Sequence, residues 1–264
     1  MRFALLAGLV LGLALPIPAL AATGDQAPLK DVHWSFEGPF GTFNRADLQH
    51  GFQVYKEVCS ACHSLDRVAF HTLSEAGGQS FTPAQMKAIA AGYKIAAEPN
   101  EKGETIDDKG NPLTRAGTPA DHFPPPFANE QAARAANGGS LPPDLSLIVK
   151  ARVGGPQYIY SLITGFGQKP PADFKVVEGK YYNPYFLTWN ISMPQPLVDG
   201  QVTFVDGAPN KIADEAYAVV TFLSWASEPH LEERHRIGLG VMIFLIVLSG
   251  LLYLTYRRVW RDAH

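Results

Sequence analysis

The residues best suited to chemistry are two cysteines and a histidine that stand close together. Cys59 and Cys62 are the two cysteines of the chain, and His63 directly follows the second. On a helical turn, residues three positions apart share a face, so both thiols can reach the same partner. The Cys-x-x-Cys-His pattern is typical of covalent haem attachment, in which the thiols add to two porphyrin vinyl groups and the imidazole binds the iron. The motif therefore predicts one haem c, held by two thioether bonds.

Two other interpretations of the cysteines remain open from the residues alone. A disulfide or thiol redox pair is possible in an exported protein, but the segment lacks the strand-helix-strand context and the aromatic-cysteine start of a thioredoxin-like site. A zinc site would need further ligands at short spacing, and the nearest histidines, His50 and His71, are isolated. The surroundings of the motif favour haem over both.

The second axial ligand of the iron decides between electron transfer and gas or substrate binding. Of the four methionines, Met1 belongs to the expected signal peptide and Met242 to an apolar C-terminal stretch. Met86 follows a capped helix start and is expected to pack in the core. Met193 lies in a proline-rich loop between the motif and the last helix of the domain. We predict Met193 as the ligand, with Met86 or a histidine as alternatives; His/Met ligation favours an electron carrier over a gas sensor.

Two helices are expected to position the motif. Asn44 can cap a helix whose apolar and aromatic residues recur at helical spacing up to the cysteines. Gly51 in this helix would allow another helix to cross closely. The expected partner is the segment from Ala213 to Ser227, which Pro229 ends. Small c-type cytochromes pack their first and last helices together, so the haem is expected between them.

Both ends of the chain carry membrane signals. Residues 1–21 have a short basic start, an apolar middle and an Ala-x-Ala end, which predict a cleaved signal peptide. Residues 237–256 contain no charged side chain, and about 20 residues cross the hydrocarbon core of a bilayer. With its lead-in, the predicted transmembrane anchor covers residues 231–256. A buried core helix is the alternative for this stretch.

The charges beside the anchor set its predicted orientation. Arg257, Arg258 and Arg261 follow it, and such clusters stay in the cytoplasm. The signal peptide places residues 22–230 in the periplasm, so the two predictions agree. We expect a single-pass protein of a bacterial inner membrane, with a periplasmic haem domain and a cytoplasmic tail at residues 257–264.

The composition restricts the partners. The formal net charge is −3, and because both ends are basic, the part between them is more acidic than this figure. Such a domain repels nucleic acid and favours a basic partner. Residues 99–122 are rich in Gly, Pro and acidic side chains and are expected to form surface loops. Their acidic residues could steer a basic cytochrome c, but a solvated loop is the simpler explanation and the one favoured here.

Longer stretches resemble one family, cytochrome c1, the haem subunit of the ubiquinol:cytochrome c oxidoreductase (bc1) complex. The resemblance covers essentially the whole mature chain and is far more specific than the haem motif. The matching stretches are Trp34–Phe36, Gly38–Gly41, Arg45, Gly51–Tyr55, Ala132–Ser146, Ala151–Arg152, Gly154–Gly155, Tyr158, Tyr182–Phe186, Phe222–Leu223 and Trp225–Pro229. The resemblance implies a mainly α protein, with a class I cytochrome c-like haem domain, inserted loops and one C-terminal transmembrane helix.

The resemblance also implies roles for single residues. Met193 is similar to the axial ligand of the family, and Arg152 matches a residue that pairs with a haem propionate, for which a planar bidentate cation is suited. Asn137, Pro143 and Tyr158 match residues that line or hydrogen-bond the haem pocket.

Partners and activity follow from the same resemblance. The implied activity is one-electron transfer from the Rieske iron–sulfur subunit to soluble cytochrome c, beside cytochrome b and in a dimeric complex. The chain would thus be the electron-transfer subunit of a quinol–cytochrome c reductase, without catalysis at the level of substrate by itself. The alternative is a stand-alone anchored cytochrome that feeds an oxidase or a photosynthetic reaction centre.

This sequence departs from the family pattern in three places. His71 stands where relatives usually carry arginine, and Pro-Gln-Pro follows Met193 in place of tighter proline patterns. No cysteine is left for the extra disulfide that some bacterial relatives hold in an inserted loop. These places are where local contacts are expected to differ from those of relatives.

Overall fold

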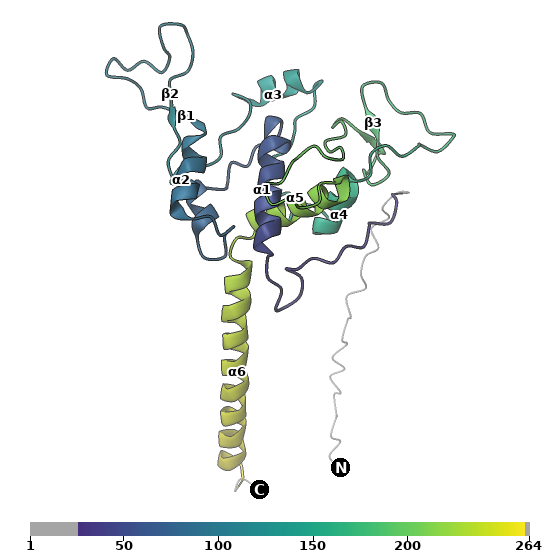
Figure 1. Cartoon of the computed structure of the whole chain (residues 1–264). Helices are drawn as coiled ribbons and strands as arrows, with labels where there is room; N and C mark the ends of the chain where they lie inside the picture. The colour runs from purple at the N-terminus through teal and green to yellow at the C-terminus, as the bar shows by residue number, and fades with distance from the viewer. Residues whose placement is uncertain (1–25, 262–264) are drawn as a thin grey trace, which may run out of the picture.

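Six α-helices carry the fold of residues 26–261, the part of the chain that the computed structural model describes (Figure 1). The expected signal peptide at residues 1–21 lies outside this range. The helices are α1 (Arg45–Glu57), α2 (Pro83–Ala91), α3 (Glu130–Ala136), α4 (Gly155–Ile163), α5 (Ile212–Ser227) and α6 (Leu231–Val259). Two 3-10 turns, η1 (Cys59–Ala61) and η2 (Phe70–Ser74), follow α1. The predicted mainly α class is confirmed.

Two short antiparallel ribbons complete the fold. β1 (Lys94–Ala96) pairs with β2 (Thr114–Ala116), with Ile95 opposite Arg115. β3 (Tyr181–Tyr182) pairs with β4 (Asn190–Ile191). The sequence predicted only surface loops over residues 99–122. The prediction is correct for the exposed tip of the first ribbon but missed β2, because the strand is three residues long and carries no alternating pattern.

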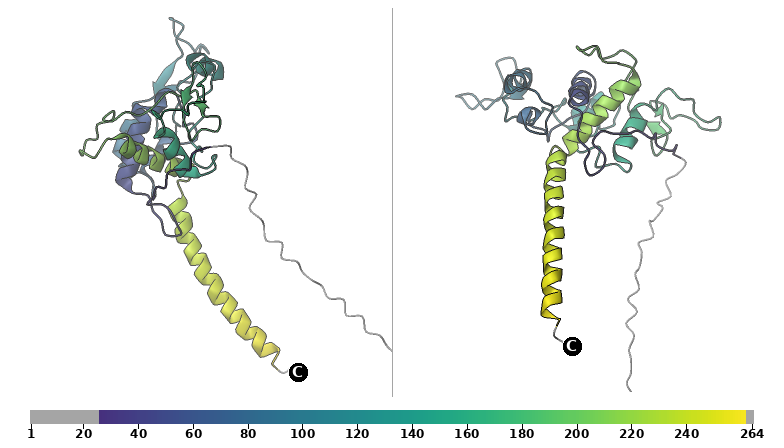
Figure 2. Two further views of the ribbon diagram at one scale, coloured as in Figure 1. Left: turned by 90° about the vertical axis from the view of Figure 1, so that its right-hand side faces the viewer. Right: turned by 60° about the horizontal axis from the view of Figure 1, so that its bottom comes forward.

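The helices α1 and α5 cross in direct contact at the centre of the head domain, residues 26–230 (Figure 2). The side-chain oxygen of Asn44 accepts the backbone N–H of Ala46 at 2.9 Å, which confirms the predicted cap of α1. Gly51 is buried, and an added Cβ atom there would lie 2.0 Å from the carbonyl oxygen of Ala218. The predicted close crossing is therefore confirmed, and α5 ends at Ser227 as expected.

Aromatic side chains fill the space around this crossing. Phe52 and Tyr55 of α1 lie with ring centres 5.8 and 5.7 Å from that of Phe222 in α5. Phe123, from the segment after the first ribbon, also contacts both α1 rings, with its ring centre 6.0 Å from that of Phe52 and 6.2 Å from that of Tyr55. Burial of these large rings stabilises the head domain. It also fixes α1, and with it the start of the cysteine motif.

The helix α6 leaves the head domain as a single rod (Figures 1 and 2). Its 29 residues correspond to a length of about 44 Å at the usual helical rise. Within the described residues it is the one helix long and apolar enough to cross a membrane. None of its residues is buried, so the alternative of a core helix is wrong. It continues to Val259, past the predicted end of the anchor at residue 256.

Only residues 228–230 separate α5 from α6, and they are well fixed. Glu228 forms ion pairs with Lys150 at 2.7 Å and with Arg234 of α6. The N–H of Leu231 donates to the carbonyl of Glu228 at 3.2 Å, and the Leu231 side chain packs against the core. The head domain and α6 are therefore joined without a flexible linker.

Candidate functional site

The cysteine motif lies on the turn that follows α1. The helix ends at Glu57, and Cys59–Ala61 form the 3-10 turn η1. The N–H groups of Cys62 and His63 both donate to the carbonyl of Cys59, at 3.1 and 2.9 Å. In a 3-10 turn, residues three apart are eclipsed. The two thiols were expected to share one face of an α-helix. The structure places them on a 3-10 turn, which is tighter and also puts residues three apart on one face.

The imidazole of His63 is oriented by a backbone carbonyl. Its Nδ1 lies 2.8 Å from the carbonyl oxygen of Pro143, 80 residues further along the chain. A carbonyl only accepts hydrogen bonds, so Nδ1 carries the proton and Nε2 keeps its lone pair. Burial lowers the pKa of His63, although the Pro143 bond and Asp144 oppose the shift. A neutral imidazole with a free Nε2 is the form that binds a metal.

Asp144 holds the Pro143 segment against the motif. Its carboxylate accepts the Ser64 hydroxyl at 2.7 Å, the N–H of Asp66 at 3.0 Å and that of Ser146 at 2.8 Å. Burial would raise the pKa of Asp144, but the hydrogen bonds from Ser146, Asp66 and Ser64 hold it below the ordinary value. The ionised carboxylate therefore fixes the position of the Pro143 carbonyl. No functional role of Asp144 was predicted from the sequence.

The thiol of Cys59 lies in apolar surroundings. Burial, followed by the nearby Cys62, raises the pKa of Cys59 to about 12. A thiol that stays protonated at neutral pH is a poor nucleophile for disulfide exchange. This environment weighs against the thiol redox interpretation. Within residues 26–261 no three His, Cys, Asp or Glu side chains gather as a group that could hold a metal ion.

Met193 lies half-buried in the loop that follows β4. The neighbouring Ser192 accepts the Ser140 hydroxyl at 2.7 Å and Lys180 Nζ at 2.6 Å. The segment 140–146, which carries Pro143 to His63, therefore also holds the loop of Met193. Met86, the other methionine candidate, is buried in the core on α2, as the sequence predicted.

The remaining predicted site residues lie on two further elements. Arg152 is exposed, and within residues 26–261 its guanidinium donates a hydrogen bond to the Ala151 carbonyl alone, at 3.0 Å. Burial raises the pKa of Tyr158, and the charge of Arg152 opposes this rise. Asn137 ends α3, where its amide donates to the Ala133 carbonyl at 2.7 Å. No hydrogen bond joins Arg152, Tyr158 or Asn137 to His63 in the described chain.

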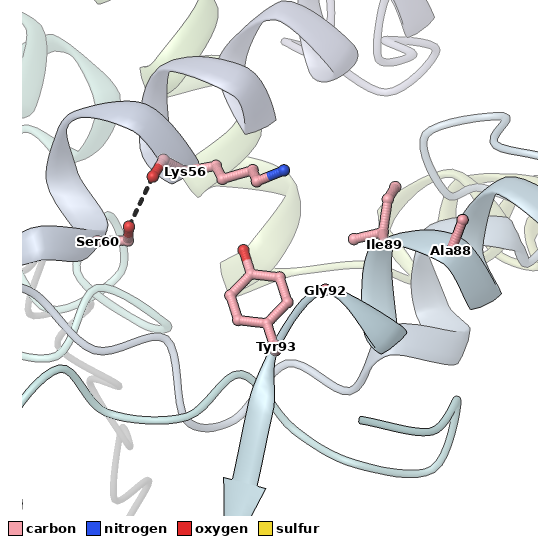
Figure 3. Close-up of a pocket in the computed structure, with 6 residues that line it drawn as sticks. All are labelled: Lys56, Ser60, Ala88, Ile89, Gly92 and Tyr93. Carbon is pink, nitrogen blue, oxygen red and sulfur yellow. Dashed lines mark hydrogen bonds between the residues drawn. The ribbon is translucent and has the colours of Figure 1, made fainter. Parts of the chain in front are cut away.

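A surface hollow of about 220 Å³ lies near the motif but outside this group of residues (Figure 3). It is lined by Lys56, Ser60, Ala88, Ile89, Gly92 and Tyr93. Burial raises the pKa of Tyr93 to about 12, and its hydroxyl has no hydrogen-bond partner among residues 26–261. Neither this hollow nor a second one of about 480 Å³ beside α1 is lined by His63 or Met193.

The donor set fits a c-type haem. Two thiols share one face of a turn, the adjacent imidazole presents Nε2, and a thioether lies on a loop held by the same segment. In c-type haem proteins, thioethers formed from cysteine thiols attach the porphyrin, and imidazole and methionine sulfur ligate the iron.

Comparison with known proteins decides the family. The model of the Cytochrome C1 family matches residues 34–263. The chain belongs to the cytochrome c1 family. Membership implies a c-type haem and a role in electron transport, which agrees with the donor set. The bacterial and mitochondrial relatives of this family support a cytochrome c1 role in a bc1 complex and do not favour a stand-alone cytochrome.

Individual relatives span bacteria and mitochondria. Cytochrome c1 of Rhodospirillum rubrum is 43% identical over 272 residues, covering 97% of this chain and 95% of the relative. The mitochondrial cytochrome c1 haem protein of Kluyveromyces lactis is 49% identical, over 94% of this chain and 79% of the relative. The cytochrome b/c1 of Bradyrhizobium diazoefficiens is 49% identical over 88% of this chain, which spans 35% of that longer protein.

Proposed function

We propose that this chain carries one haem c, bonded to Cys59 and Cys62 and ligated by His63 and Met193. In this role it passes single electrons from a Rieske iron–sulfur subunit to soluble cytochrome c during quinol oxidation. The observation that carries the proposal is the 2.8 Å contact between His63 Nδ1 and the Pro143 carbonyl, which leaves Nε2 free beside two thiols. The chain would act as the electron-transfer subunit of a quinol–cytochrome c reductase.

The residues of the chain set the properties of such a centre. When bound, the haem supplies a reversible one-electron couple. The Pro143 carbonyl holds the imidazole in one tautomer and raises its basicity, as second-shell acceptors do for metal-bound histidines. The thioether of Met193 favours ferrous iron and a high potential. Arg152 is available, through its exposed guanidinium, for a propionate.

Pro143, Tyr158 and Asn137 are proposed to line the haem. Pro143 contacts the His63 ring through its carbonyl, and the charge of Arg152 opposes the rise in the pKa of Tyr158. Asn137 lies three residues before Ser140, whose hydroxyl reaches the loop of Met193.

We propose a placement in the bacterial inner membrane with the head domain in the periplasm. The cluster of Arg257 and Arg258 at the end of α6 supports a cytoplasmic C-terminus. Cytochrome b is the proposed neighbour of α6, which is supported by the relative that bears the name cytochrome b/c1. The Rieske subunit and a dimeric complex are proposed from family membership.

The test is purification of the protein from its native membrane. A pyridine haemochrome spectrum of the denatured chain should show haem c that stays with the polypeptide, because thioether bonds survive denaturation. A subunit with b-type haem and an iron–sulfur protein should purify with it. A colourless chain after acid–acetone extraction would overturn haem attachment, and a haem-bearing chain that purifies alone would favour the stand-alone cytochrome.

A further inference from the structure

The loop before α1 holds one aromatic side chain outward between two that point inward. Phe36 and Phe43 are buried, with ring centres 4.9 Å apart. Phe40, midway between them, is 73% exposed. The loop is closed at its base, where the N–H of Thr42 donates to the Ser35 carbonyl at 3.0 Å. Gly38 takes a positive φ of 77°, which turns the tip away from the core.

Polar contacts fix this loop against the first turns of α6. Nδ1 of His235 lies 3.2 Å from the carbonyl of Gly41. The N–H of Phe43 donates to Glu232 at 2.8 Å, and Arg45 pairs with the other oxygen of the same carboxylate at 2.6 Å. Figures 1 and 2 show the loop beside the end of α6 that adjoins the head domain. These contacts therefore fix the position of Phe40 along the axis of α6, which is called its height below.

That height coincides with the polar-to-apolar boundary of α6. The uncharged stretch begins at Ile237, two residues after His235, which is about 3 Å along the helix axis. Aromatic side chains gather at this level in membrane proteins, where the hydrocarbon begins. Glu37 is the charged residue of the loop, and its carboxylate accepts a hydrogen bond from the side-chain amide of Gln157 in α4 at 3.0 Å. Because this bond holds the carboxylate at the head domain, its charge does not oppose contact of the loop with the membrane.

We propose that the loop Glu37–Gly41 touches the bilayer and that Phe40 inserts into its interfacial region as a second membrane contact beside α6. The occupant of this surface is lipid. A single helix would leave the head domain free to tilt over the membrane. A second contact restricts this tilt. The inference rests on the proposed placement of α6 in the bilayer, and the experiment tests that placement separately.

The experiment uses nitroxide labels on the full-length, haem-loaded protein in vesicles of phosphatidylcholine and phosphatidylglycerol. Haem attachment consumes both native thiols, so an introduced cysteine is the one that reacts. Labels are placed by Phe40→Cys, by Pro39→Cys, which keeps Phe40, and by Val205→Cys, which is fully exposed on another loop. Ile246→Cys reports on the middle of α6. Collision with oxygen, which partitions into lipid, is compared with collision with a water-soluble nickel complex.

The proposal predicts an oxygen-to-nickel collision ratio several-fold higher at positions 39 and 40 than at 205, and highest at 246. A ratio at 39 and 40 equal to that at 205 would place the loop in water and overturn the inference. Shielding from both reagents would mean that protein covers the loop, which also overturns it. A low ratio at 246 would overturn the membrane placement of α6 together with the inference, whereas a high ratio at 246 alone would leave that placement standing.

Discussion

An added Cβ atom at Gly51 would lie 2.0 Å from the carbonyl oxygen of Ala218. The backbones of α1 and α5 therefore touch, without an intervening side chain. Since α1 ends at the cysteine motif and α5 leads to α6, this contact joins the candidate haem site to the membrane helix.

Gly51→Ala should separate the two helices. The new methyl group would also meet Phe222 Cβ at 2.7 Å, so one helix must shift. Overpacking of this kind costs about 1–3 kcal/mol, which corresponds to roughly 2–12 °C in the melting temperature of a domain of this size. Gly238→Ala is the matched control, because nothing lies within 4 Å of its Cβ position. Melting is followed by circular dichroism. Equal melting curves for both variants would contradict the close contact between Gly51 and Ala218.

Met193→Leu should lower the reduction potential sharply or open the iron to carbon monoxide, because leucine keeps the volume but has no thioether. The same substitution at Met86 is the control. Met86 is buried in the core, where leucine replaces methionine at little cost, usually below about 1.5 kcal/mol. Potentiometric titration and carbon monoxide difference spectra provide the measurements. An unchanged potential in Met193→Leu would refute the ligand assignment.

Asp144→Ala should weaken the hold of the Pro143 segment on His63. The substitution removes acceptors for Ser64, Asp66 and Ser146, and hydrogen bonds to a charged group contribute about 1.5–3 kcal/mol each. We expect a loss of about 2 kcal/mol or more in the free energy of unfolding, measured by urea titration of the Soret band.

Asp107→Ala is the matched control for that variant. Asp107 also accepts backbone N–H groups, but in an exposed turn at the tip of the first ribbon. A loss within about 0.5 kcal/mol is expected there. Equal effects of the two substitutions would argue against a special role of Asp144.

The Arg115–Asp121 pair predicts a pH dependence. Hydrogen bonds from Arg115 and then Thr118 hold the pKa of Asp121 well below its ordinary value of 3.8. A depressed pKa means that the ionised carboxylate stabilises the fold above pH 3.8, and that this stabilisation is lost as the pH falls towards the folded pKa. Amide exchange of Thr118, whose N–H donates to Asp121 at 2.7 Å, should therefore lose protection in acid.

The Asp121→Asn variant should lack this dependence. Its Thr118 amide should be less protected at neutral pH, and the difference from the native chain should vanish in acid. Asp108→Asn, an exposed carboxylate on the same ribbon, is expected to keep native protection. A native-like pH profile in Asp121→Asn would show that the pair does not stabilise this turn.

Local patterns in the sequence predicted α1, the start of α2, α5 and α6, because their capping residues and apolar spacing are local signals, but they did not predict α3 or α4. The cap at Asn44 and the small residue at Gly51 were both recognisable from the sequence, and the end of α5 at Ser227 follows from Pro229. The 3-10 turn at Cys59 was not distinguished from an α-helix, because both place residues three apart on one face. The strands β3 and β4 are two residues long, too short for any period.

The contacts that assemble the candidate site join distant parts of the chain. Ser140 and Ser192 are 52 residues apart, and His63 and Pro143 are 80 apart. The two types of signal that the sequence offers, periodicity and turn residues, do not report such pairs. An acceptor role for Asp144 was signalled in part, since Asp followed by Ser two residues later favours a local side-chain turn. The hydrogen bonds that Asp144 accepts from Ser64 and Asp66 could not be predicted from the sequence, because these residues lie about 80 positions away in the chain.

The three fixed residues between α5 and α6 limit how this protein can work. A cytochrome that shuttles electrons on a tether needs slack in the chain, so that its head can travel between donor and acceptor. Here only three residues separate α5 from α6, and Glu228 pairs with both Lys150 and Arg234, so the chain offers no slack of this kind. In the proposed electron transfer, the partners would therefore have to come to this head domain, because its own linker is too short for it to travel to them.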